Sequence, residues 1–401
     1  MISQDMKEAK EKTELTSVIT NVDGQEVSKI HVMRPLPASM KVKQCLKYFN
    51  SEYILMTFLH WMGLLHESEN RVLFGVFSGL FILTTISSLI MICIHRNSDR
   101  LKLSLLHLST YFLGTLIWLS MRRQRKRLPN LLRSVSKSQS FFFTKFQKVF
   151  FYLTCSVPFL CVTQEVLKQT IAKTTDFYYI YGFQVSFYVG NLVNSLAWIL
   201  HSFIYPTYAN LVGLLYSLLC LYVCTKLSLI TDDIESCSAQ EFTISRQRDV
   251  LGREAEIERL VHCIQKIFSV PSFLIATAHF SACIAILGTL IVNSRIYTKD
   301  YAVLNQLIVV FLSSSGGLLA CLWAAGGIPI EEDRFKDTFR RKTKQRFQLV
   351  NGKNERCIQN QILEKPTFVL SGCEIIYFRR SSILSLAGTV LTYTILLIRK
   401  N

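Results

Sequence analysis

Seven long apolar runs, separated by shorter charged segments, dominate the pattern of this chain. Each run has 17 to 27 residues, and a helix needs roughly 20 predominantly apolar residues to cross the hydrocarbon core of a bilayer. The runs occupy residues 72–94, 103–121, 149–167, 203–229, 268–292, 302–328 and 382–398. The pattern therefore predicts an all-α, polytopic membrane protein with seven transmembrane helices.

An eighth apolar stretch, residues 177–200, has the length of a further span, and loop charge decides its place. Residues 122–148 contain nine Lys or Arg and no acid, and residues 334–365 contain ten Lys or Arg. Basic loops of this kind stay in the cytoplasm, which requires an even number of crossings between them. We therefore expect residues 177–200 outside the cell, as an aromatic-rich extracellular loop or a half-inserted segment. Its aromatic side chains fit either a lid over a ligand pocket or the belt that Tyr forms at membrane interfaces.

The same charge pattern predicts a cytoplasmic N-terminus and an extracellular C-terminus, the reverse of a G-protein-coupled receptor. Residues 1–44 are polar and charged from the start, which predicts a cytosolic, disordered segment and no cleaved signal peptide. Residues 45–367 are expected to hold the first six membrane helices. An amphipathic stretch along the membrane surface (45–65) would precede the first helix, and residues 235–259 would extend the fourth and fifth into the cytoplasm.

The last segment, residues 368–401, is too long for one straight crossing. Its 31 residues from 368 to 398 would make a helix of about 46 Å. Arg379 and Arg380 lie in its middle, where two charges in hydrocarbon would be costly. We therefore expect a cytoplasmic helix that ends near Arg380, followed by a short seventh membrane helix at 382–398 with no cytosolic tail behind it.

Composition changes this picture little. Half of the residues are hydrophobic and 18% are charged, with a formal net charge of +17. The basic residues lie in loops beside apolar runs, which argues against nucleic acid as a partner. Most of the twelve cysteines lie inside apolar runs without the spacing of a metal site, so we expect them to pack as small apolar residues. No catalytic or phosphate-binding motif occurs, and we expect no enzyme activity, no cofactor and no metal.

The stretch "FVLSGCEIIYFRRSSILSLAGTVLTYTILLIRKN" at 368–401 resembles the C-terminal signature of the arthropod gustatory receptor family, the seven-transmembrane chemoreceptor ion channels related to insect odorant receptors. Segments 63–75 and 262–280 are similar to that family's entry to spans one and five. The signature ends on Gln-Phe, where this chain has Arg399 and Lys400. The matching positions are Gly372, the "RRSS" break at 379–382, Gly388, Thr392 and Tyr393.

The resemblance implies a ligand-gated, non-selective cation channel in the plasma membrane, detecting small-molecule tastants. It implies a homotetramer, or a heteromer with related subunits, in which the last helix of each subunit lines the pore. The pore-lining and gate positions would be Tyr393, Leu396, Arg399 and Lys400. Four Arg side chains at 399 would oppose cations. Three explanations stay open: Arg399 extends to lipid headgroups, the subunit works beside a different partner, or the channel is not cation-selective.

Other classes of protein are alternatives. A secondary transporter would show repeated halves with broken helices, and a G-protein-coupled type of receptor would have the opposite orientation. Polar residues within the runs also have two interpretations each. His107 and His279 are either hydrogen-bonded packing residues or ligand contacts, and Glu165 with Lys168 is either a solvated interface pair or part of a pocket. Gly316 and Gly317 favour close helix packing or form a gating hinge.

Overall fold

The computed structural model describes residues 52–61, 64, 71–94, 101–138, 145–172, 177–180, 183–292, 301–350 and 366–399. They belong to one compact unit, Cys45–Asn401. The predicted disorder of residues 1–44 lies outside the described residues, as does Lys400.

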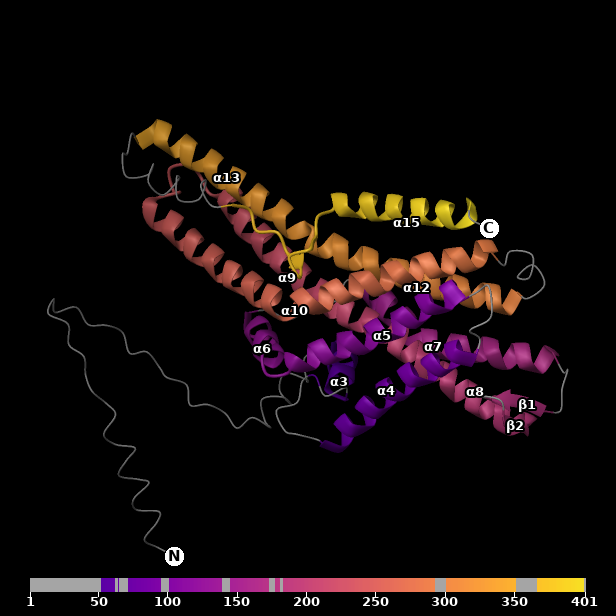
Figure 1. Cartoon of the computed structure of the whole chain (residues 1–401). Coiled ribbons are helices and arrows are strands. Elements are labelled where there is room, and N and C mark those ends of the chain that lie inside the picture. The colour runs from indigo at the N-terminus through magenta and orange to yellow at the C-terminus, as the bar shows by residue number, and fades with distance from the viewer. Residues whose placement is uncertain are drawn as a thin grey trace, which may run out of the picture. The chain divides into compact units, whose positions relative to one another are not determined.

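The described part of the chain is almost entirely helical (Figure 1). Its helices are α3 (Glu52–Trp61), α4 (Arg71–Ile94), α5 (Leu101–Arg123), α6 (Leu128–Ser138), α7 (Lys145–Ala172), α8 (Phe187–Ser202), the π-helix η1 (Phe203–Tyr208), α9 (Ala209–Ser236), α10 (Ile244–Val292), α12 (Tyr301–Ala325), α13 (Gly327–Val350) and α15 (Ser381–Arg399). Two short antiparallel hairpins accompany them: β1 (Phe177–Ile180) with β2 (Phe183–Ser186), and β3 (Ser371–Gly372) with β4 (Ile376–Tyr377).

The predicted apolar runs are helical apart from the turn at Gly326 within the run 302–328, which confirms the all-α membrane fold. Four helical stretches are long and apolar enough to cross a membrane, and two shorter apolar ones accompany them, Gly75–Ser87 and Ser381–Leu396. The four long ones are Gln147–Leu167, Tyr188–Ser236, Ile244–Ile291 and Val303–Leu349. The count of seven spans and the orientation of the two termini stay predictions.

Residues 187–200 form a helix, which fits the half-inserted segment of the two expectations and not the loop. Only the hairpin β1–β2 has that character, because α8 starts at Phe187 and continues through η1 into α9. Non-helical torsion angles at Tyr205 and the proline at 206 bend the path between the two helices. No turn residue separates this apolar stretch from the next apolar run, so a continuous helix satisfies the backbone hydrogen bonds of both. In a bilayer, where no water is available to backbone groups, that conformation is strongly favoured.

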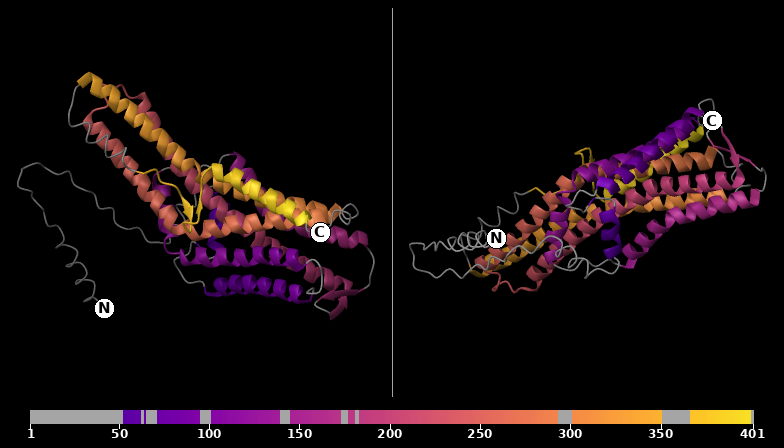
Figure 2. Two further views of the ribbon diagram at one scale, coloured as in Figure 1. Left: turned by 45° about the horizontal axis from the view of Figure 1, so that its top comes forward. Right: turned by 90° about the horizontal axis from the view of Figure 1, so that it is seen from below.

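Opposite ends of the helix bundle have different compositions. Figure 1 shows α6 and α13, which carry the basic segments, at one end, and the hairpin β1–β2 and the end of α15 at the other. The two views of Figure 2 agree with this arrangement. Beyond the basic end, α9, α10 and α13 continue together; α9 ends at Ser236 and α10 begins at Ile244, and the cytoplasmic location of these extensions stays a prediction. Ion pairs hold the extensions, among them Arg246–Asp233 at 2.7 Å and Arg334–Asp232 at 3.0 Å.

The predicted cytoplasmic helix at 368–380 is wrong. The chain forms the hairpin β3–β4 there, and its tight turn requires positive φ angles at Cys373 (52°) and Glu374 (60°). Contacts with α10 select this conformation. The Gln265 side chain donates to the Ser371 carbonyl at 2.8 Å and accepts from the Ser371 amide at 3.0 Å. The long charged helix that extends beyond the apolar runs is α13 (Gly327–Val350), which precedes the hairpin in the chain.

The core follows α9. Residues 204–220 are buried without interruption, because this uncharged stretch is surrounded by α5, α7, α10 and α12. At the basic end, α3 also packs inward: Leu55 and Leu59 are fully buried, and Phe58 lies 5.5 Å from Phe203 between ring centres. The expected amphipathic stretch is therefore a helix with a buried face.

Candidate functional site

A cavity of about 360 Å³ lies among α5, α7, α8, η1, α10 and α12. Most of its lining is apolar, as for Ile286 and Leu307, and polar side chains are few. Sites for small molecules have this character, in which apolar walls supply burial and a few polar groups fix orientation. Six separate elements contribute to the cavity, so no single motif marks it in the sequence.

Glu165 is a polar group of this cavity. Its side chain is buried in α7, and its carboxylate accepts a hydrogen bond of 3.0 Å from the Asn194 amide of α8. The structure therefore favours the pocket interpretation over the solvated interface pair. The side chain of Lys168 lies outside the described residues. Thr110 of α5, Ser202 of α8 and Gln306 of α12 are buried polar residues that line the same cavity from other helices.

Tyr205 connects the cavity to a neighbouring cluster of buried polar groups that includes His279 and Ser314. Its ring lines the cavity, and its hydroxyl lies 3.0 Å from Ser314 Oγ, 3.1 Å from His279 Nδ1 and 3.3 Å from the Ala278 carbonyl oxygen. His279 is fully buried, which supports its interpretation as a hydrogen-bonded packing residue. The side chain of His107 is outside the described residues. Sequence reasoning missed Tyr205, whose signal is a polar ring beside a proline inside an apolar run.

Gly317 allows this cluster to form. A Cβ atom at 317 would overlap Asn210 Oδ1 and would come within 3.0 Å of His279 Nε2. The Asn210 amide donates to Ser313 Oγ at 2.8 Å on the same helix, α12. Gly317 thus lets α9 and α10 approach α12, which confirms close helix packing. The gating hinge at Gly316 and Gly317 stays a prediction.

The start of α15 is held at the junction between α12 and α13. Gly326 lies so close that a Cβ there would come 2.7 Å from the Arg380 backbone nitrogen. The guanidinium carbon of Arg380 lies 4.3 Å from the centre of the Trp323 ring, a favourable cation–π geometry. On the α10 side, Gly372 packs against the backbone of Phe273 with no room for a side chain. The "RRSS" break is therefore the point where α15 is attached to the bundle.

Of the residues expected to line a pore, Tyr393 and Leu396 lie on the free part of α15. About half of each side chain is exposed at Tyr393 (53%) and Leu396 (54%). Gly388 has nothing within 4 Å of where a Cβ would lie, and Thr392 donates to the Gly388 carbonyl at 2.8 Å. Arg399 is the last residue of the helix, and its side chain is outside the described residues.

Comparison with known proteins identifies the fold. No model of a known protein family matches the sequence, and no curated protein sequence matches it. Among solved structures, 17 chains match. One is the insect olfactory receptor OR5 from Machilis hrabei, solved in complex with eugenol. The match has a TM-score of 0.62 at 12% sequence identity, and it covers 90% of this chain and 99% of the receptor. The chain therefore shares the fold of an insect olfactory receptor.

Proposed function

We propose that this chain is a subunit of a chemosensory receptor that is itself a ligand-gated ion channel in the plasma membrane. The observation that carries the proposal is the mostly apolar cavity, together with the buried Tyr205 that joins it to the neighbouring polar cluster. The shared fold supports it, because the olfactory receptor was solved with the small molecule eugenol bound. The resemblance of residues 368–401 to the gustatory signature selects tastants as the ligand class.

The cavity defines the chemistry of the ligand. Its volume of about 360 Å³ is at the small end of ligand pockets, so it fits a compact molecule and no peptide or lipid. Apolar walls favour a ring or a short hydrocarbon. Glu165, Gln306 and Ser202 offer acceptors and donors for one or two hydroxyl groups of the ligand. A small phenol or a compact polyol satisfies both conditions.

The free face of α15 supports assembly into a pore. Its apolar side chains are largely exposed in the described part of the chain, as at Leu384 (78% exposed) and Leu391 (62% exposed). Within one subunit the helix packs on α10 and α12, and four copies would bring the opposite faces together around an axis. Leu396 would then form an apolar constriction that closes by dewetting. Arg399 at the helix end would extend to lipid headgroups.

Two tryptophan substitutions on α12 test the pocket. Val310 lines the cavity, whereas Leu312, two residues further on, is 62% exposed on the outer surface of the helix. We expect Val310→Trp to fill the cavity and abolish ligand-evoked currents, and Leu312→Trp to leave them unchanged. Whole-cell recording with a panel of tastants gives the currents, and surface biotinylation shows that both variants reach the membrane. Equal responses from the two variants would place the ligand elsewhere.

A second measurement tests the pore. Reversal potentials under asymmetric salt report ion selectivity, and Arg399→Gln restores the neutral residue of the gustatory signature. If Arg399 extends to headgroups, the reversal potential stays unchanged and the channel conducts cations in both forms. A shift toward cation selectivity in Arg399→Gln would place the Arg side chains at the axis instead.

A further inference from the structure

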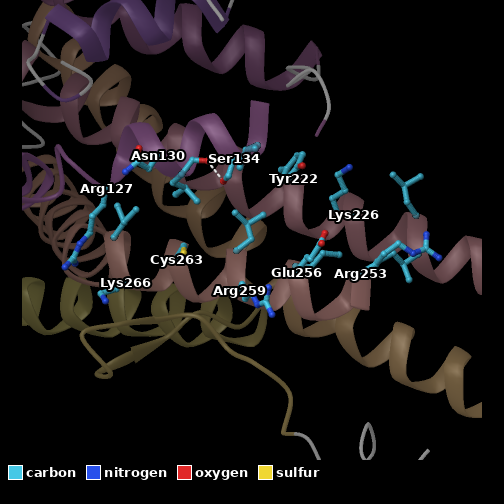
Figure 3. A pocket seen from close by; sticks show the side chains of 17 residues that line it. Arg127, Asn130, Ser134, Tyr222, Lys226, Arg253, Glu256, Arg259, Cys263 and Lys266 are labelled. Atoms are coloured by element: carbon cyan, nitrogen blue, oxygen red, sulfur yellow. Dashed lines mark hydrogen bonds between the residues drawn. The ribbon is translucent and has the colours of Figure 1, made fainter. Parts of the chain in front are cut away.

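A second cavity lies at the basic end of the bundle, apart from the proposed ligand pocket. Its volume is about 900 Å³, and it opens between the α5–α6 turn, α6, α9 and α10 (Figure 3). Five basic side chains and one acidic side chain, Glu256, line it. The basic residues are Arg127, Lys226, Arg253, Arg259 and Lys266, and we refer to the cavity as the basic pocket.

Most of this positive charge is uncompensated. Arg253 is paired with Asp233 at 2.6 Å. Within the described ranges, no ion pair joins the other four basic residues to a carboxylate. Lys226 instead lies over the Tyr222 ring, 5.5 Å from its centre. Basic groups that share one concave site without partners repel each other, so a bound anion with several charges would relieve that repulsion.

The position of the basic pocket along the helices matches the headgroup level of a membrane. Arg127 follows the apolar run at 103–121, Lys226 lies near the end of the run at 203–229, and Lys266 directly precedes the run at 268–292. Basic residues that flank apolar spans lie at the cytoplasmic membrane interface. A ligand of the basic pocket should therefore be a molecule that is present at the headgroup level of the membrane.

The wall between the charges is apolar. Figure 3 shows Arg127 and Lys266 at one end of the pocket and Lys226 with Arg253 at the other. Leu131 and Val135 form the buried side of the amphipathic helix α6, and Leu229 is 48% exposed beside them. A free inositol phosphate or inorganic phosphate gains nothing from such a wall. A phospholipid needs both parts, because acyl carbons accompany its headgroup.

We propose that the basic pocket binds an anionic phospholipid of the cytoplasmic leaflet that has a multiply phosphorylated headgroup. Arg259 and Lys266 of α10, with Arg127 and Lys226, contact the phosphates as charge-assisted donors. The acyl carbons lie against Leu131, Leu229 and neighbouring residues. The bound lipid thereby joins α6 to α9 and α10. This inference does not depend on the proposed tastant site, and its test requires no channel activity.

The test measures lipid binding to the purified full-length protein in detergent micelles. The probes are dioctanoyl phosphatidylinositol 4,5-bisphosphate, dioctanoyl phosphatidylcholine and inositol 1,4,5-trisphosphate. Microscale thermophoresis gives the dissociation constant of each probe. The variant Arg259→Gln/Lys266→Gln removes two charges of the pocket. Arg248→Gln/Arg340→Gln removes two exposed charges outside it and serves as the matched control. With each basic group contributing about a factor of 5, the pocket variant is expected to bind the bisphosphate lipid roughly 25-fold more weakly.

The control variant is expected to bind like the wild-type protein, and phosphatidylcholine not at all. Equal affinities of the two double variants would overturn the site. Equally tight binding of inositol trisphosphate would overturn the lipid and assign the pocket to a soluble anion. Cys263 lines the pocket and is exposed, whereas Cys237 lies outside it. In wild-type protein the lipid must slow maleimide labelling at Cys263 and leave Cys237 unchanged, as read by peptide mass spectrometry. No protection of Cys263 would refute the proposal even if the variants misfold.

Discussion

Two buried tyrosines of η1 provide a matched pair for testing the polar cluster. Tyr205 and Tyr208 are three residues apart and are both buried. The Tyr205 hydroxyl lies within hydrogen-bond distance of His279 and Ser314. The Tyr208 hydroxyl has no hydrogen-bond partner among the described residues. The substitutions Tyr205→Phe and Tyr208→Phe thus remove the same atom from opposite environments.

The expected cost of Tyr205→Phe follows from what it leaves behind. His279 Nε2 has no partner in the described part of the chain, and Tyr205→Phe removes the partner of His279 Nδ1. Both ring nitrogens of the buried imidazole would then be without a hydrogen bond. A buried polar group left unsatisfied costs about 1–3 kcal/mol, while hydrogen bonds within membrane bundles average only about 0.6 kcal/mol. We expect Tyr205→Phe to reduce the free energy of unfolding by about 1–2 kcal/mol. Tyr208→Phe removes an unpaired hydroxyl, and we expect a change close to zero or a slight stabilisation.

The assay is unfolding of the purified full-length protein in mixed micelles by titration with sodium dodecyl sulfate, followed by Trp fluorescence. Both variants are compared with wild type in the same lipid and detergent. A loss at Tyr208 as large as that at Tyr205 would show that ring packing, and not the hydroxyl, determines the effect. No loss at Tyr205 would show that the cluster contributes nothing to stability.

Two further predictions concern the attachment of α15 and the extended bundle. Gly372→Ala is expected to lower the thermal midpoint in detergent, because its Cβ would come 3.0 Å from the Phe273 backbone. Gly388→Ala has open space around its Cβ and should raise the midpoint slightly, because Ala has the higher helix propensity. The opposite order of the two midpoints would contradict the packing. Beyond the apolar run of α9, the hydrogen bond from Arg253 lowers the pKa of Asp233, so its carboxylate stabilises the fold above the unfolded pKa of about 4 and loses that effect as the pH falls further. Asp233→Asn should therefore flatten the dependence of the thermal midpoint on pH below about 4, and an unchanged slope would exclude this ion pair as a contributor.

Local composition predicted the elements well, and tertiary contacts explain where prediction failed. Apolar runs in lipid have to be helical, and mixed charges at helical spacing predicted the extended part of α10. The hairpin β3–β4 could not be predicted, because Gln265 and Phe273 hold it from about 100 residues away. The helical conformation of residues 187–200 was left open between a loop and a half-inserted segment, because loop charge counts crossings and says nothing about conformation. A helix that continues into the next span adds no crossing.

The candidate site was only partly predictable for the same reason. Glu165 and His279 stood out as ionisable residues within apolar runs, and the structure places both near the cavity. Their partners, Asn194 and Tyr205, are polar but uncharged, and each comes from a different helix. Nothing in one sequence shows which of many such residues will face one another. The basic pocket combines three segments in the same way, although Arg127 and Lys266 lie beside apolar runs, where the positive-inside rule expects basic residues.

The architecture gives the proposed ligand a physical connection to the proposed pore. Two helices, α10 and α12, both line the cavity and both hold the start of α15. On α10 the distance along the helix from Ala282 in the cavity to Gln265 at the hairpin is about 26 Å, and on α12 that from Gln306 to Gly326 is about 30 Å. A helix can transmit a displacement over such lengths, and Pro271, which lies within this stretch of α10, is the point where that helix can bend. Because α15 packs on the same two helices, we expect a ligand that alters their separation at the cavity to alter the seat of Arg380 as well, and with it the position of α15.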